Sequence, residues 1–82
     1  MNLKEFIEQF EAKMEVKDEH LYYNAFDSST NIVFALEDNV TVSIGVFDDE
    51  PDSAVYCIHI DEVLIMNGSM ALDKLIECFG KV

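Results

Sequence analysis

The sequence predicts an α+β domain in which two helices and one antiparallel sheet form a two-layer sandwich. Apolar residues recur at spacings of three and four near both ends of the chain, as in amphipathic helices, but alternate with period two through its middle, as in strands. Of the 82 residues, 50% are apolar, enough to fold one small domain over residues 1–82. We expect three to four strands, with both helices on one face of the sheet.

The first helix is expected over residues 2–17. Its apolar stripe consists of Leu3, Phe6, Ile7, Phe10 and Met14. On a helical projection three glutamates of the opposite face lie within about 60° of one another. These are Glu8, Glu11 and Glu15. An ordinary solvated face explains such a row, but it is also a candidate binding surface.

The middle of the chain has the pattern of strands joined by turns. Alternation over residues 20–26 ends at the polar stretch 27–31, and a second alternating run follows at 32–36. Asp38-Asn39 offers a tight reversal before residues 40–46, the clearest strand. One apolar residue in every two predicts an antiparallel sheet with a single covered face. The exposed face is expected to present Thr41, Ser43, Cys57 and His59.

The second half of the chain begins with an acidic loop. Residues 48–53 include Pro51 and a dense run of acids, which excludes a central strand. A strand is expected at 54–60, and residues 63–66 are either its continuation past a bulge or a short separate element. The tripeptide 67–69, Asn-Gly-Ser, predicts a break, after which the spacing predicts a last helix ending at Gly80.

The sequence offers no arrangement suited to catalysis or to a cofactor. Cys57, His59 and Asp61 recur on one strand face, but side chains two residues apart stand about 7 Å apart, too far for direct hydrogen bonds. No Gly-rich phosphate loop is present. We therefore expect a protein that is not an enzyme.

No metal site is expected either. The acidic loop lacks the central Gly and distal Glu of a calcium-binding EF-hand loop. The soft ligands His20, Cys57, His59 and Cys78 form no paired motif. Both cysteines lie within apolar patterns, which favours buried, reduced thiols.

Charge is the strongest functional signal. The chain has 17 acidic residues against 5 Lys, for a net charge of −12, and no Lys or Arg occurs between Lys17 and Lys74. Such a protein repels nucleic acid and favours a positively charged partner. Acids three or four apart on a helix stand about 5 to 6 Å apart, comparable to neighbouring phosphates of one DNA strand. The partner-binding residues are predicted to be Asp48, Asp49, Glu50, Asp52, Asp61, Glu62, Glu8, Glu11 and Glu15.

In size, acidity without arginine and helix–strands–helix order, the chain resembles phage-encoded inhibitors that mimic DNA, especially small anti-CRISPR proteins and the uracil-DNA glycosylase inhibitor. The resemblance implies an inhibitor that occupies the basic DNA or RNA channel of a CRISPR effector, a nuclease complex or another nucleic-acid-binding protein. The alternative is an acidic protein-binding module of another kind, such as a nuclease immunity protein or a secretion chaperone. The opening helix followed by strands is similar to the start of the secretion-chaperone fold.

The sequence also bears on location and assembly. The first ten residues lack the basic and apolar segments of a secretory signal, and no apolar stretch is long enough to span a membrane. We expect a cytoplasmic protein, in the host cytoplasm if a phage encodes it. A solvated, halophile-like surface is another explanation of the acidity. An exposed sheet face or strand edge would also allow two copies to pair as a homodimer.

Overall fold

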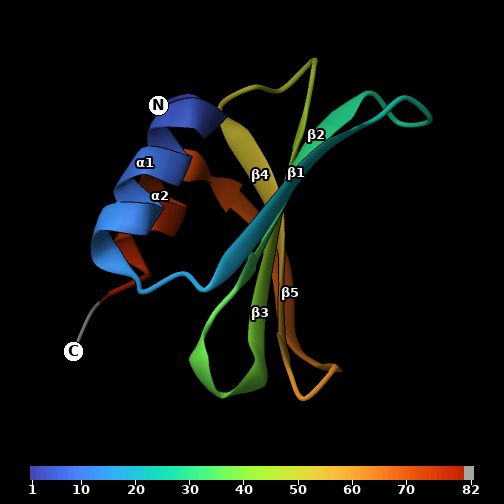
Figure 1. The fold of residues 1–82 in the computed structure, drawn as a ribbon. Helices are drawn as coiled ribbons and strands as arrows, with labels where there is room; N and C mark the ends of the chain where they lie inside the picture. Colours follow the sequence, from blue (N-terminus) through green and yellow to red (C-terminus); the bar gives the residue numbers. More distant parts are fainter. Residues whose placement is uncertain (81–82) are drawn as a thin grey trace.

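The computed structural model describes residues 1–80 and has one antiparallel sheet of five strands and two helices (Figure 1). In chain order the elements are α1 (Leu3–Lys13), β1 (Asp18–Asn24), β2 (Ser29–Ala35), the 3-10 turn η1 (Glu37–Asn39), β3 (Val40–Phe47), β4 (Ser53–Ile60), β5 (Val63–Ala71) and α2 (Leu72–Glu77). The predicted α+β class is confirmed, whereas the predicted number of strands, three to four, is wrong.

The sheet is a simple meander. Its strands lie in the order β1-β2-β3-β4-β5, so each strand pairs with its neighbours in the sequence. Both helices lie on the same side of the sheet, and the opposite face is uncovered (Figure 1). Consecutive connections therefore alternate between the two ends of the sheet, which decides where the charged loops lie.

The fifth strand arises where the sequence predicted a break. Asn67, Gly68 and Ser69 continue the pairing with β4, opposite Cys57, Tyr56 and Val55 respectively. A Cβ atom at Gly68 would lie 2.9 Å from the Tyr56 hydroxyl oxygen, so this glycine makes room for a cross-strand ring. The glycine signals a close approach here and not a turn.

The reversal before β5 occurs at Asp61 and Glu62, whose φ angles are 52° and 67°. Asp38 and Asn39 also have positive φ angles, 59° and 60°, which confirms the predicted reversal before β3. Asp and Asn adopt this left-handed conformation more readily than most residues. The glutamate at position 62 has no such preference, so local sequence did not reveal the second turn.

The first helix is shorter than expected. Asn2 caps it, because the Glu5 amide donates to Asn2 Oδ1 at 2.9 Å while Glu5 Oε1 accepts from the Asn2 amide at 3.3 Å. The helix ends at Lys13 instead of residue 17, since Lys17 already donates its amide to the Ala35 carbonyl at 2.8 Å. The second helix also ends early, at Glu77. Neither helix in residues 1–80 is long and apolar enough to cross a membrane.

The core lies between the helices and the sheet. It consists of Phe6, Phe10, Ile32, Phe34, Val42, Ile44, Val46, Ala54, Leu72, Leu75 and Ile76. The ring of Phe10 stacks on that of Phe34 with centroids 4.1 Å apart, and Phe79 meets Phe10 edge-on at 5.0 Å. Aromatic packing thus joins α1, the sheet and the segment that follows α2.

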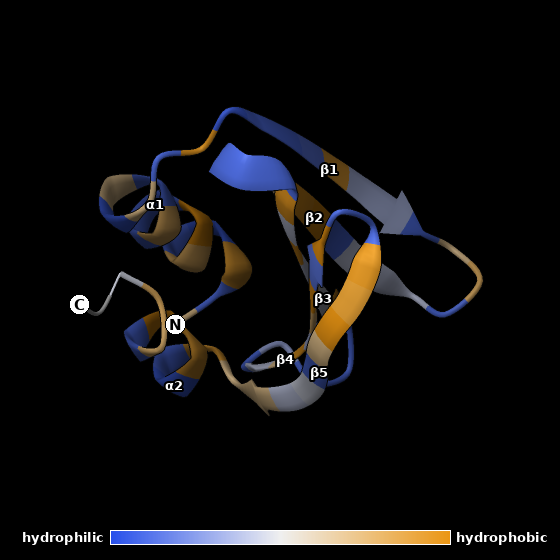
Figure 2. Cartoon of the chain, turned by 90° about the horizontal axis from the view of Figure 1, so that it is seen from below, coloured by the Kyte–Doolittle hydropathy of each residue, from blue (hydrophilic) through white to orange (hydrophobic). Residues whose placement is uncertain are grey.

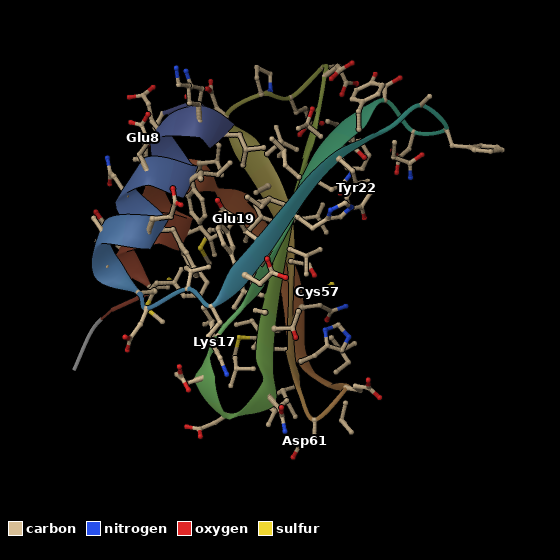
Figure 3. The ribbon with its side chains drawn as sticks, in the orientation of Figure 1. Glu8, Lys17, Glu19, Tyr22, Cys57 and Asp61 are labelled. Atoms are coloured by element: carbon tan, nitrogen blue, oxygen red, sulfur yellow. The ribbon has the colours of Figure 1, made fainter. Side chains whose placement is uncertain are left out.

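The uncovered face holds the expected polar residues. Val42 and Ile44 are buried toward the helices, so Thr41 and Ser43 point away from them, and they pair with His59 and Cys57. Figure 3 shows Cys57 on this side of the sheet. Both cysteines are free; Cys57 is half-buried, but Cys78 is exposed, against the expectation of two buried thiols.

Phe10→Ala should lower the free energy of unfolding by about 3–5 kcal/mol, because it leaves a cavity between α1 and β2. Phe26→Ala is the matched control, since this side chain in the β1–β2 turn is fully exposed and its removal should change stability by less than about 0.5 kcal/mol. Urea unfolding followed by circular dichroism measures both values. Equal losses would contradict the placement of the core.

Candidate acidic interface

The acidic side chains are exposed and mostly without ion pairs. All 17 Asp and Glu residues are exposed to solvent. Within residues 1–80, Asp73 pairs with the N-terminal ammonium at 2.8 Å and Glu37 lies 3.9 Å from Lys17 Nζ, and no other salt bridge occurs. The remaining carboxylates face solvent without a cation of the described chain beside them.

The meander divides the loop acids between two ends of the sheet. The Asp48 amide donates to the Ser28 carbonyl at 2.9 Å, so the β3–β4 loop lies beside the β1–β2 turn. At the opposite end the Asp61 amide donates to the Asn39 carbonyl at 3.1 Å, which joins the β4–β5 turn to η1. Strand β4, about 25 Å long, separates the two groups.

The first end carries the predicted loop acids, and we call it the loop end. It consists of Asp27, Asp48, Asp49, Glu50 and Asp52. Backbone hydrogen bonds hold the loop: Glu50 donates to Phe47 at 3.0 Å, Ser53 donates to Glu50 at 3.2 Å, and Leu72 donates to Asp52 at 2.9 Å. Asp27 was not among the predicted site residues, and it accepts a hydrogen bond from Ser29.

At the other end lie two more of the predicted partner-binding residues, Asp61 and Glu62, which form the β4–β5 turn beside η1 (Glu37–Asn39). Asp61 Oδ1 accepts a hydrogen bond from Asn39 Nδ2 at 3.0 Å. Since β4 intervenes, Asp61 and Glu62 do not extend the row formed by residues 48–52. The single surface expected from the sequence is therefore two separate groups of acids.

The helical row is also rearranged. Glu8 and Glu11 lie on α1, but Glu15 follows the end of the helix and does not continue their row. Glu19 of β1 takes the place of Glu15 beside Glu11, and the carboxyl groups of Glu19 and Glu11 share a hydrogen bond. Desolvation and the negative charge of Glu11 raise the pKa of Glu19. Figure 3 shows Glu8 on α1 and Glu19 on β1.

The helix-facing side of β1 forms a continuous strip with these acids. Glu19, Leu21 and Tyr23 are opposite Phe34, Ile32 and Thr30, so they share the face that the helices cover. They stand about 7 Å apart along the strand. We define the β1 strip as Glu8, Glu11, Glu19, Leu21 and Tyr23. Glu19, Leu21 and Tyr23 were not among the predicted site residues, because alternation along residues 20–26 indicates only a strand.

The strip continues directly into the loop end. The Tyr23 hydroxyl donates to Asp48 Oδ2 at 2.8 Å, and this hydrogen bond, partly opposed by one from Ser28, raises the pKa of Tyr23. The neutral hydroxyl therefore remains a donor at physiological pH. Phe26, in the turn that follows β1, is fully exposed.

An apolar groove accompanies the strip. It has a volume of about 470 Å³ and lies between α1 and the sheet, lined by Leu3, Lys4, Ile7, Glu8, Leu21 and Thr30. Leu21 is 57% exposed although it faces the helix layer. Apolar and aromatic groups bordered by charge are typical of protein interfaces, in which a few such side chains anchor the partner.

The residues considered for catalysis remain apart. Cys57 lies opposite Ser43 and His59 opposite Thr41 on the uncovered face, whereas Asp61 lies in the turn at the end of β4 and bonds to Asn39. Across residues 1–80, no group of three or more His, Cys, Asp or Glu side chains is arranged to hold a metal ion.

Comparison with known proteins identifies no relative: no family model matches the chain, and no curated protein or solved structure is significantly similar to it.

Glu19→Gln should stabilise the fold slightly at neutral pH, because it removes repulsion between Glu19 and Glu11. The raised pKa of Glu19 means that the folded chain binds this proton more tightly than the unfolded chain does. The wild-type therefore loses stability as the pH rises from 4.5, the usual glutamate pKa, through the raised pKa of the folded state. Exposure and screening limit the gain to less than about 0.5 kcal/mol.

Thermal unfolding at pH 7 and at pH 3 measures the effect, which should disappear at the lower pH. Glu62→Gln, in the β4–β5 turn and three strands away from β1, controls for the change in net charge. An equal gain from Glu62→Gln would show that total charge, and not the contact with Glu11, is responsible.

Proposed function

We propose that the chain is a non-catalytic inhibitor that binds the basic nucleic-acid-binding surface of a target protein, such as a CRISPR effector or a nuclease complex, in place of DNA or RNA. The observation that carries the proposal is the set of exposed carboxylates, of which only Asp73 and Glu37 have an ion pair within residues 1–80, in a sequence with no arginine. Lysine and arginine side chains that hold phosphates would meet these carboxylates.

The loop end and the β1 strip supply the binding surface. The loop acids are held by hydrogen bonds to Phe47, Glu50 and Leu72, so little ordering is needed when a partner binds. The Tyr23–Asp48 hydrogen bond connects the loop to the strand. Glu19, Glu11 and Glu8 continue the negative charge along one side of the molecule.

Inhibition of this kind requires no reaction. The negative field accelerates encounter with a basic channel, and the bound domain, 33 Å in its longest dimension, then blocks the channel sterically. Because salt screens exposed charges over about 10 Å at 0.1 M, binding should weaken steeply as salt is added. Cytoplasmic location, where such targets occur, belongs to the same proposal.

A second candidate is an acidic protein-binding module that recognises a basic amphipathic segment, as an immunity protein or a secretion chaperone would. The apolar groove lined by Leu3, Ile7 and Leu21 favours this candidate, because a DNA or RNA backbone has no apolar feature to which such a groove would correspond. In this mode an apolar side chain of the partner enters the groove while its basic residues meet Glu8, Glu11 and Glu19.

Neutralising the loop end should weaken binding more than an equal change elsewhere. The test variant is D48N/D49N/E50Q/D52N, and the matched control is E37Q/D38N/D61N/E62Q, which removes the same charge from the opposite end. Four exposed ion pairs at about 0.2–1 kcal/mol each predict a loss of affinity of about fourfold to several hundredfold for the test variant.

The wild-type chain is used to capture its partner from host lysate at low salt, and each variant is then titrated against the purified partner with labelled DNA as competitor. Equal losses for both variants would show that net charge alone matters. A captured partner that still binds DNA normally when saturated with the chain would refute the inhibitor proposal.

Salt separates the two candidates. Leu21→Ser should leave the affinity nearly unchanged if the surface acts only through charge, but should lower it about tenfold, even in high salt, if an apolar side chain fills the groove. Titration of the captured partner at two salt concentrations measures this. Val55→Ser, on the uncovered sheet face and 43% exposed, is the control and should bind like the wild-type chain in either case.

A further inference from the structure

Strand β1 has an open edge and exposed side chains. It is the first strand in the sheet order, so one of its edges has no neighbouring strand within residues 1–80. Six of its seven residues are exposed, although Glu19, Leu21 and Tyr23 face the helix layer. Figure 2 shows β1 as a mostly hydrophilic strand, in contrast to the hydrophobic part of β5. Room for another strand therefore remains beside β1, at an edge of acidic character.

Backbone hydrogen bonds of the neighbouring strands show which groups of β1 point outward. The Asp48 amide donates to the Ser28 carbonyl at 2.9 Å, and these two residues continue the register of β2 and β3 by one step. Hydrogen-bonded and non-hydrogen-bonded pairs alternate along an antiparallel ladder. The odd-numbered residues of β2, among them Asn31 and Val33, therefore direct their backbone groups to β1.

The alternation continues in β1. Tyr22 is opposite one of these β2 residues, so the amide and carbonyl of Tyr22 point to β2. The backbone groups of Glu19, Leu21 and Tyr23 then point to the open edge. The Glu19 amide agrees with this direction, because it donates to Asp18 Oδ1 at 2.9 Å and not to β2. The residues with outward backbone groups are thus the same three whose side chains belong to the β1 strip.

We propose that an extended basic segment of a partner protein adds to β1 as a sixth strand, antiparallel to it like every other pair of this sheet. The backbone groups of the segment bond to those of Leu21 and Tyr23, a mode of recognition known as β-strand addition. The inference rests on the second candidate function, recognition of a basic amphipathic segment, and it assigns that segment an extended conformation.

The groove beside α1 determines the central position of this segment. Side chains opposite each other in paired strands share one face of the sheet, so the partner residue opposite Leu21 points to the helix side. The apolar groove lined by Leu3, Ile7 and Leu21 lies there. An apolar side chain at this position enters the groove and covers Leu21, which is otherwise 57% exposed.

Acids determine the positions two residues away on either side. The partner side chain opposite Glu19 meets two carboxylates, because Glu11 lies beside Glu19. The one opposite Tyr23 meets the carboxylate of Asp48, to which the Tyr23 hydroxyl donates at 2.8 Å. Lysine or arginine fits both positions. The expected pattern is therefore basic, any residue, apolar, any residue, basic.

Charge decides which kind of strand can pair with this edge. Acidic side chains on an edge strand oppose its pairing with other chains. They repel a second copy of this chain, which has a net charge of −12. Opposite charges directly across a sheet are stabilising, so the same acids admit a basic strand. The edge thus selects its partner by repelling acidic alternatives.

Capped synthetic peptides test the proposal on the purified chain. The probe is Thr-Lys-Thr-Leu-Thr-Lys-Thr, and Lys-Lys-Leu-Thr-Thr-Thr-Thr has the same composition and charge without the alternation. Two further peptides are the probe with an N-methyl group on the Leu amide, which points to β1, or on the next Thr amide, which points away. Calorimetric titration at low salt measures their affinities.

The reordered peptide and the peptide methylated at Leu should bind at least about tenfold more weakly than the probe, because they lose the groove contact or a backbone hydrogen bond. The peptide methylated at Thr should bind like the probe. Hydrogen exchange followed by NMR gives a second readout: the probe should slow exchange of the Leu21 and Tyr23 amides and leave β5 unchanged.

A probe that binds no better than the reordered peptide overturns the proposal. Equal binding of the two methylated peptides, or protection of β5 in place of β1, also overturns it. If the probe fails in this way while D48N/D49N/E50Q/D52N still weakens binding of the captured partner, strand addition is wrong but the acidic binding surface stands.

Discussion

The stacking of Phe10 on Phe34 is the contact on which the arrangement of this domain depends. It docks α1 on β2, and the edge-on ring of Phe79 brings the segment after α2 to the same place. Once one sheet face is covered, the period of two along each strand decides which side chains meet the helices. Glu19, Leu21 and Tyr23 lie on the helix side of the sheet because they share a face with Phe34 and Ile32.

The position of the acids shows how a small domain carries a net charge of −12. Every carboxylate stays at the surface, where water screens it, and none is placed in the core. The cost is self-repulsion, visible where Glu11 and Glu19 approach each other. Hydrogen bonds of the sheet and a continuous apolar core oppose that repulsion, while the field remains available to attract a partner.

The two edges of the sheet have opposite chemical characters. One edge combines carboxylates, an apolar groove and exposed aromatic rings. The other edge, β5, carries no charged side chain. Because a meander keeps its first and last strands apart, the two characters stay separate on the surface.

The sequence by itself determined the elements whose signals are local: the apolar stripe of α1, the alternation of β2 and β3, the reversal at Asp38 and Asn39, and the exposed acidic loop. Periodicity and turn preferences act between near neighbours, so these features are visible without a structure. The separation of residues 48–52 from Asp61 and Glu62 was not among these features, because it follows from the five-strand meander.

Only the tertiary structure decided the rest, because contacts between distant residues were responsible. Tyr56 packs over Gly68, and residues 67–69, whose sequence is typical of a turn, pair with β4 as part of β5. Lys17 bonds to Ala35 and ends the helical row before Glu15, and Glu19 comes to lie beside Glu11 in its place. The total charge can be counted from the sequence. The positions of the acids on the surface depend on how α1 packs against β1 and β2.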